Sequence, residues 1–131
     1  MFDDSACREL APRRDCPING VLVRLGEKWT LLTMVALAQA ENKILHFADL
    51  KRQLPAISQK MLTSTLRTME RDGLVDRHFF PEVPPRTKYE LTLRGQDLLA
   101  SMEGFFGWAH AHWSGILDSR RQYDLEEIRR Q

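Results

Sequence analysis

The alternation of apolar and polar positions predicts a mainly helical chain with one short pair of strands. Apolar residues recur at helical spacing from Pro17 onward and again over 47–54 and 58–72. Residues 29–40 are apolar on nearly every side, as expected of a buried central helix. Apolar and polar residues alternate over 75–92 in the manner of two paired strands. This order predicts an α+β fold, mainly α with a small antiparallel β element.

Residues 58–72 carry helix signals at both ends. Ser58 is suited to the N-cap, because its hydroxyl can accept a hydrogen bond from the first turn. Gly73 can adopt the left-handed conformation that closes a helix. The turn at Pro55 joins this helix to the one over 47–54. We therefore predict a helix-turn-helix with 58–72 as its recognition helix.

The outer face of the predicted recognition helix is polar and basic. Its apolar residues share one stripe, so side chains that can bind base edges or phosphates point the other way. These candidate DNA contacts are Ser58, Gln59, Lys60, Thr63, Ser64, Arg67 and Arg71. An ordinary solvated face is the alternative for this helix taken alone, and the segment that follows it favours DNA.

That segment is predicted to form a wing over 75–92. Three prolines lie between its two alternating stretches and should stiffen the tip. A strand, a stiff loop and a second strand after a helix-turn-helix form a wing. Arg77, Arg86 and Lys88 are then placed to contact a phosphate backbone or a narrow minor groove.

Charge is distributed unevenly along the chain. The formal net charge is only +1, but residues 43–94 hold ten Lys and Arg against six Asp and Glu. The basic excess therefore lies in the middle of the chain, the part that contains the predicted helix-turn-helix and wing, which is the distribution expected of a DNA-binding domain.

The C-terminal part predicts a dimer interface. Thr92 is suited to cap one long helix whose apolar residues repeat at steps of four and three. The predicted seam consists of Leu98, Met102, Phe105, Ala109, Trp113 and Ile116. A domain this small cannot easily bury so much apolar surface, so we expect a second subunit to cover it. The polar stretch 118–131 predicts a further terminal helix on the dimer.

The predicted domain order is therefore an N-terminal arm (1–15), a winged helix-turn-helix (16–95) and C-terminal dimerisation helices (92–131). No apolar run reaches membrane-spanning length, and the first residues lack the features of a signal peptide, which predicts a cytoplasmic protein.

Nothing in the residue pattern predicts catalysis or a cofactor. Cys7 and Cys16 are too few and too far apart for a disulfide framework or a four-ligand zinc site. The four histidines form no recognisable catalytic set, and no glycine-rich phosphate loop is present. We therefore expect a protein that is not an enzyme, with no metal and no cofactor.

Six local sequences occur together in a characteristic order. They are Cys16-Pro17-Ile18, Gly26-Glu27-Lys28-Trp29-Thr30-Leu31-Leu32, Phe47-Ala48-Asp49-Leu50-Lys51-Arg52, Ile57-Ser58-Gln59-Lys60-Met61-Leu62-Thr63, Leu66-Arg67-x-Met69-Glu70-x-Asp72-Gly73-Leu74-Val75 and Pro84-Pro85-Arg86-Thr87-Lys88-Tyr89-Glu90-Leu91-Thr92-x-x-Gly95. In this order the chain resembles the HxlR family of bacterial winged-helix transcription regulators. The resemblance extends from Cys16 to about Leu99.

The resemblance implies a homodimer on a pseudo-palindromic DNA operator. The recognition helix would enter the major groove, and the wing would reach the flanking backbone or minor groove. The first helix, with Ile18 and Leu22, would join the C-terminal helices in the dimer interface.

The resemblance also suggests a signal. Some members of the family sense oxidants or electrophiles through a cysteine just before the first helix, where Cys16 stands. A thiol at a helix N-terminus near Arg13 and Arg14 should favour the reactive thiolate, and Cys7 could be its resolving partner. The competing interpretation is an inert, half-buried cysteine, and the frequency of buried cysteines favours it.

Two further alternatives remain open at the level of sequence. A small-molecule effector could lie in the aromatic dimer seam, with Trp29, Phe105 and Trp108 as walls, although plain core packing is the better interpretation of such a stripe. A winged helix can also bind proteins instead of DNA. A protein-binding module would have no need of the basic helix face and basic wing.

Overall fold

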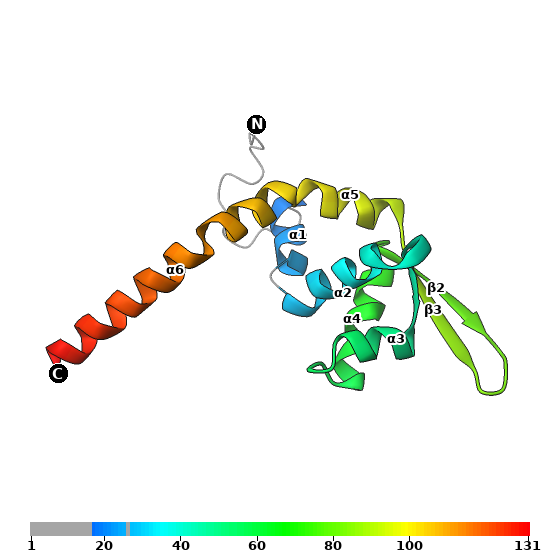
Figure 1. Ribbon diagram of the computed structural model, residues 1–131. Helices are drawn as coiled ribbons and strands as arrows, with labels where there is room; N and C mark the ends of the chain where they lie inside the picture. Colours follow the sequence, from blue (N-terminus) through cyan, green and yellow to red (C-terminus); the bar gives the residue numbers. More distant parts are fainter. Residues whose placement is uncertain (1–16, 26) are drawn as a thin grey trace. The chain divides into compact units, whose positions relative to one another are not determined.

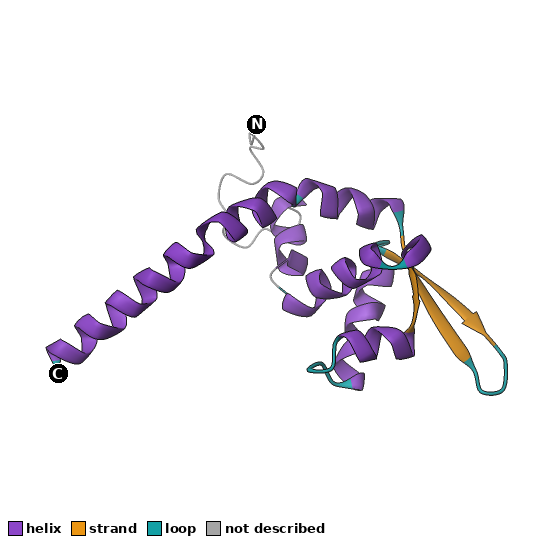
Figure 2. Ribbon diagram, viewed as in Figure 1, coloured by secondary structure: helices purple, strands orange, loops and turns teal. Residues whose placement is uncertain are grey.

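The computed structural model describes residues 17–25 and 27–131, so Cys7, Cys16 and the predicted arm lie outside the described residues. The helices are α1 (Pro17–Leu25), α2 (Lys28–Gln39), α3 (Phe47–Gln53), α4 (Gln59–Arg71), α5 (Leu93–Ser101) and α6 (Glu103–Arg130). The strands are β1 (Ile44–His46), β2 (Val75–Phe80) and β3 (Arg86–Leu91), and a 3₁₀ turn spans Glu41–Lys43. The mainly helical fold with a small antiparallel sheet is confirmed (Figure 2).

The chain divides into two compact units, one up to Gln96 and the other Asp97–Gln131. In the first unit, α2 lies against α3, α4 and β3 (Figure 1). Its core is formed by the apolar faces of these elements, and the side chains with almost no exposed surface include Met34, Leu37, Leu50, Leu62, Leu66, Met69 and Leu91. The predicted central helix is thus largely buried, although Leu32 is exposed.

The wing consists of β2 and β3, which belong to a three-stranded antiparallel sheet with strand order β1-β3-β2. Val75 pairs with Leu91 at its base and Phe80 with Arg86 near its tip. The short strand β1 pairs with the other edge of β3, where Ile44 lies opposite Glu90. This arrangement fixes the wing to the body of the domain through β1.

The α4 helix begins and ends as its sequence predicts. The Ser58 hydroxyl oxygen accepts a hydrogen bond from the Met61 amide at 3.0 Å. Gly73 has a φ of 74°, and the Leu74 amide donates to the Met69 carbonyl at 2.9 Å. These contacts are a side-chain N-cap and a Schellman C-cap. They set the length of α4.

The prediction of one long helix from Thr92, followed by a separate terminal helix, is wrong. Helix α5 ends at Ser101, Met102 is the N-cap of the next helix with φ −92° and ψ −1°, and α6 then runs from Glu103 to Arg130. The Ser101 hydroxyl donates to the Leu98 carbonyl at 2.6 Å, and the Met102 amide bonds to Leu99 instead. A side chain that competes for a helix carbonyl explains the break.

None of the helices in the described part of the chain is both long and apolar enough to span a membrane.

Candidate nucleic-acid interface

The exposed face of α4 presents most of the predicted contact residues. Its inner side is buried through Leu62, Thr65, Leu66 and Met69. The exposed side chains on the outer side are Ser58, Gln59, Lys60, Ser64, Arg67 and Arg71. The helix thus has a fixed apolar face and a free polar one, as base and phosphate recognition requires.

Thr63 differs from the others because it is half-buried. Its hydroxyl donates to the Gln59 carbonyl at 2.9 Å. The proton is therefore engaged within the helix, which leaves the oxygen as an acceptor and the methyl group as an apolar contact.

A cleft of about 340 Å³ lies between α4 and the wing, and predicted contact residues from both elements line it. Its walls include Gln59, Thr63 and Arg67 from α4 and Arg77 from β2. The structure therefore brings together four of the side chains that the sequence predicted from two separate segments. Lys60, Ser64 and Arg71 do not line this cleft.

Four residues that line the cleft were not among the predicted contacts: Phe47, Glu70, Thr87 and Tyr89. Tyr89 is only 7% exposed, and burial raises the pKa of its phenol, while the positive charge of Arg77 acts in the opposite direction. Tyr89 faces Arg77 across the β2–β3 pair. The strand register would have identified Tyr89 as a neighbour of Arg77, had the pairing been known.

The wing does not bury the apolar residues of β2 as strand alternation suggested. Beyond Val75 every residue of β2 is exposed, and the Phe79 side chain is 52% exposed. The hairpin projects beyond the helices (Figure 2), so its outer part meets solvent, while Val75, Tyr89 and Leu91 nearer its base are buried. The rings instead pair with cations: the Arg77 guanidinium lies 5.6 Å from the Phe79 ring and the Lys88 ammonium 5.3 Å from the Phe80 ring. Such cation–π contacts restrict the side-chain conformations of Arg77 and Lys88.

The C-terminal end of α4 is held by side chains from distant segments. Arg24 of α1 donates to the Asp72 carboxylate at 2.6 Å, and Arg94 donates to the Asp72 carbonyl at 3.1 Å. The Thr92 hydroxyl donates to the Gly73 carbonyl at 2.6 Å. The hydrogen bond to Asp72 raises the pKa of Arg24. Sequence reasoning missed this anchor, which consists of Arg24, Asp72, Thr92 and Arg94.

The predicted dimer residues show a mixed pattern of exposure. Phe105 and Trp113 are 55% and 50% exposed. The half-buried members of the set are Ile18, Leu98, Met102, Ala109 and Ile116. Leu22 lies in α1, but its side chain is outside the description. No residue of α6 is buried, so this helix carries apolar surface that its own chain leaves open.

Among residues 17–25 and 27–131, the side chains of His, Cys, Asp and Glu form no group of three or more that could hold a metal ion.

A helix-turn-helix followed by a β-hairpin that shares a cleft with its second helix defines the winged-helix class. Residues 24–116 match the family described as HxlR-like helix-turn-helix. An HTH-type transcriptional regulator of Methanothermobacter thermautotrophicus is 34% identical over 99 residues, which cover 76% of this chain and 73% of that protein. The chain belongs to the HxlR-like helix-turn-helix family of transcriptional regulators.

Solved structures agree with this placement. The transcriptional regulator YtfH from Salmonella typhimurium is 30% identical with a TM-score of 0.71, over 83% of this chain and 95% of that one. The reduced form of a protein described as the redox regulator HypR is 30% identical with a TM-score of 0.68, over 79% of this chain and 99% of that one.

Proposed function

We propose that the protein acts as a homodimer that binds a pseudo-palindromic DNA operator and regulates transcription from it. Helix α4 enters the major groove, and the wing contacts the flanking backbone or minor groove. The observation that carries the proposal is the cleft between α4 and the wing. It combines Gln59, Thr63 and Arg67 with Arg77, and all four lie within residues 43–94, the part of the chain with the basic excess.

The chemistry of the cleft suits base recognition. Arginine pairs with guanine and glutamine with adenine through two hydrogen bonds each, and such pairs contribute about 1–3 kcal/mol of discrimination. Arg67 and Gln59 lie about two turns apart on one helix face, roughly 12 Å along the axis, so they can contact bases roughly three to four pairs apart. Lys60 and Arg71 lie outside the cleft, where phosphates are the expected partners.

Binding to the intergenic DNA beside the protein's own gene tests this proposal. We expect Arg67→Ala and Lys60→Ala to lose the ability to retain the DNA in a gel shift. The affinity of Arg67→Ala for the DNA should be lower than that of the parent by about tenfold or more. Both side chains are exposed, so the thermal melt and the dimer mass should not change. Arg121→Ala, which removes an exposed arginine from α6, is the matched control. If both variants bind as the parent does, α4 is not the recognition helix.

A second element of the proposal is a thiol switch at Cys16. The likeness to the redox regulator HypR supports it, and so does the position of Cys16 directly before α1. A thiolate there would be favoured by the helix N-terminus. Oxidation or alkylation would then change operator binding, with Cys7 as a candidate resolving thiol.

We expect diamide or peroxide to abolish the gel shift of the parent protein, and Cys16→Ser to keep binding under oxidant. Cys7→Ser, measured in parallel, shows whether a resolving thiol takes part. Binding that oxidant leaves unchanged would reject the switch and make an effector in the aromatic seam of α6 the next candidate.

A further inference from the structure

A second cleft lies beside the one between α4 and the wing. It has a volume of about 370 Å³ and opens between the start of β3 and the corner where β1 meets α3. Phe47 and Thr87 line both clefts, so they form a common wall. The surface that carries Gln59 and Arg67 therefore continues directly into this second cleft.

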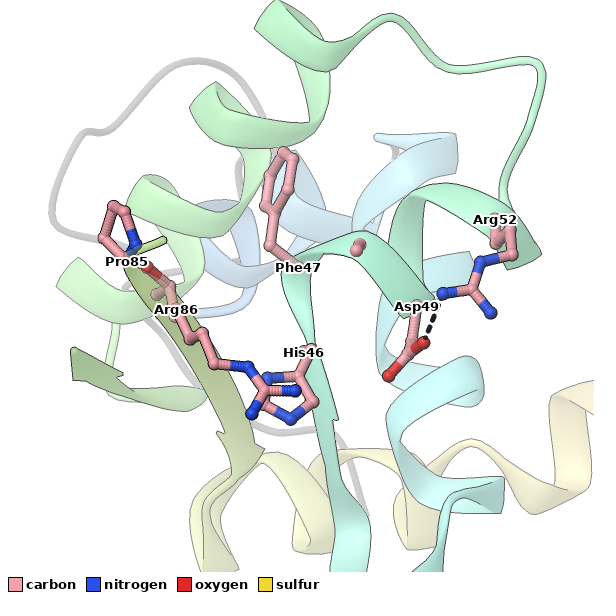
Figure 3. Close-up of a pocket in the computed structure, with 8 residues that line it drawn as sticks. His46, Phe47, Asp49, Arg52, Pro85 and Arg86 are labelled. Atoms are coloured by element: carbon pink, nitrogen blue, oxygen red, sulfur yellow. Dashed lines mark hydrogen bonds and ion pairs between the residues drawn. The ribbon is translucent and has the colours of Figure 1, made fainter. Parts of the chain in front are cut away.

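Two guanidinium groups line the second cleft from different elements. Arg86 begins β3 and extends toward His46 at the end of β1, while Arg52 reaches in from α3 (Figure 3). The one carboxylate of the lining, Asp49, pairs with Arg52 at 2.9 Å. The cleft thus holds two permanent positive charges against one negative charge.

The ion pair with Asp49 orients Arg52 without using up its donors. A guanidinium has five N–H groups in a planar fork, and the contact with Asp49 joins one nitrogen to one oxygen. Phe47 and Pro85 supply apolar walls next to the charged groups. His46 adds a further hydrogen-bonding group, and its strand partner is Lys88.

We propose that this cleft binds a phosphate group between Arg52 and Arg86. The fork of arginine matches the oxygens of phosphate in geometry as well as charge, and two arginines from opposite walls can hold one phosphate from two sides. We take the backbone of the DNA operator as the source of that phosphate, which rests on the proposed function. The backbone would run past the cleft between α4 and the wing, and the second cleft would receive one of its phosphates. A free phosphate-bearing compound is the other source with the same chemistry.

The decisive variant is Arg52→Ala, because Arg52 was not among the predicted DNA contacts. Arg121→Ala is a close control: both arginines are exposed, 76% and 70%, and both pair with an aspartate three residues earlier. The two variants therefore remove the same charge and the same kind of ion pair from different helices.

Two measurements are made on the full-length protein. The first is the salt dependence of binding to the intergenic DNA beside its gene. We expect Arg52→Ala to weaken binding at low salt and to lower the slope of log K against log salt by about 0.9, the contribution of one phosphate contact. Arg121→Ala should leave the slope unchanged. The second is a titration of the free protein with inorganic phosphate, followed through the NMR signals of the arginine Nε–H groups.

A reduced slope in Arg52→Ala identifies the DNA backbone as the source. A free phosphate compound is identified by an unchanged slope together with two NMR results. Inorganic phosphate shifts the Nε–H signals of Arg52 and Arg86 in a saturable way, and in Arg52→Ala the Arg86 signal no longer shifts. An unchanged slope without such shifts overturns the inference. If the parent protein binds no DNA, the proposed function fails, and the phosphate titration alone decides whether the cleft binds phosphate.

Discussion

Asp72 shows how one residue can fix the end of α4. Its carboxylate accepts from Arg24 and its carbonyl from Arg94, while the next residue, Gly73, supplies the left-handed turn. Helix α4 is therefore tied at its C-terminal end to α1 and to the start of α5. The position of α4 relative to α1 should depend on this anchor.

We expect Asp72→Asn and Arg24→Gln each to lower the free energy of unfolding by about 1 kcal/mol. The pair is close, but both side chains keep some solvent exposure, which weakens their attraction. The double variant should cost clearly less than the sum of the two single variants, because they remove the same contact. Urea unfolding of all four proteins measures this coupling. Strict additivity would contradict the anchor.

The same residues show what sequence can and cannot predict. Ser58 and Gly73 act through hydrogen bonds to neighbours in sequence, so their roles were predictable from spacing. Arg24 and Asp72 are 48 residues apart, and only the packing of α1 near the end of α4 brings them together. Arg77 was predicted as a basic wing residue, whereas its neighbour Tyr89 required the strand register.

At the scale of elements, α4 and the wing form the proposed DNA-contact surface, and α6 carries exposed apolar side chains. Helix α6 has 28 residues and buries none of them, yet it carries Phe105, Trp108 and Trp113. Some of this surface is already engaged within the helix: Trp108 stacks on His112 at 4.5 Å, and Arg120 lies 5.2 Å from the Trp113 ring. The remainder is the surface that a second subunit would cover.

We expect Phe105→Asp and Trp113→Asp to shift the protein from dimer to monomer, because each places a charge in the proposed seam. Sedimentation equilibrium measures the mass. Val83→Asp at the fully exposed wing tip is the control and should stay dimeric. A parent protein that is monomeric at all concentrations, or a dimer that both seam variants leave intact, would contradict this interface.

The sequence predicted the elements better than their junctions. Apolar spacing located each helix of the first unit, because burial in a small core demands that spacing. It missed the break at Met102, which depends on one hydroxyl that takes a helix carbonyl. It also failed to predict the exposure of Phe79 and Phe80, since alternation does not say how far a hairpin extends beyond the core.

At the scale of the whole molecule, the chain combines three parts. They are the proposed DNA-contact surface of α4 and the wing, the anchor between α4 and α1, and the apolar helix α6, which would bring two copies together. A dimer of this kind would present two recognition helices to one face of the DNA. Two-fold symmetry then requires two half-sites at a spacing set by the DNA helix.

Hydroxyl-radical footprinting on the intergenic DNA beside the gene tests this claim most directly. A homodimer that binds in this way should protect two half-sites of related, inverted sequence, about 10–10.5 base pairs apart or a multiple of that spacing. Weaker protection should lie outside each half-site, where the wings would reach. Both half-sites should disappear together in Arg67→Ala. A single protected segment, or protection that does not depend on sequence, would contradict the account.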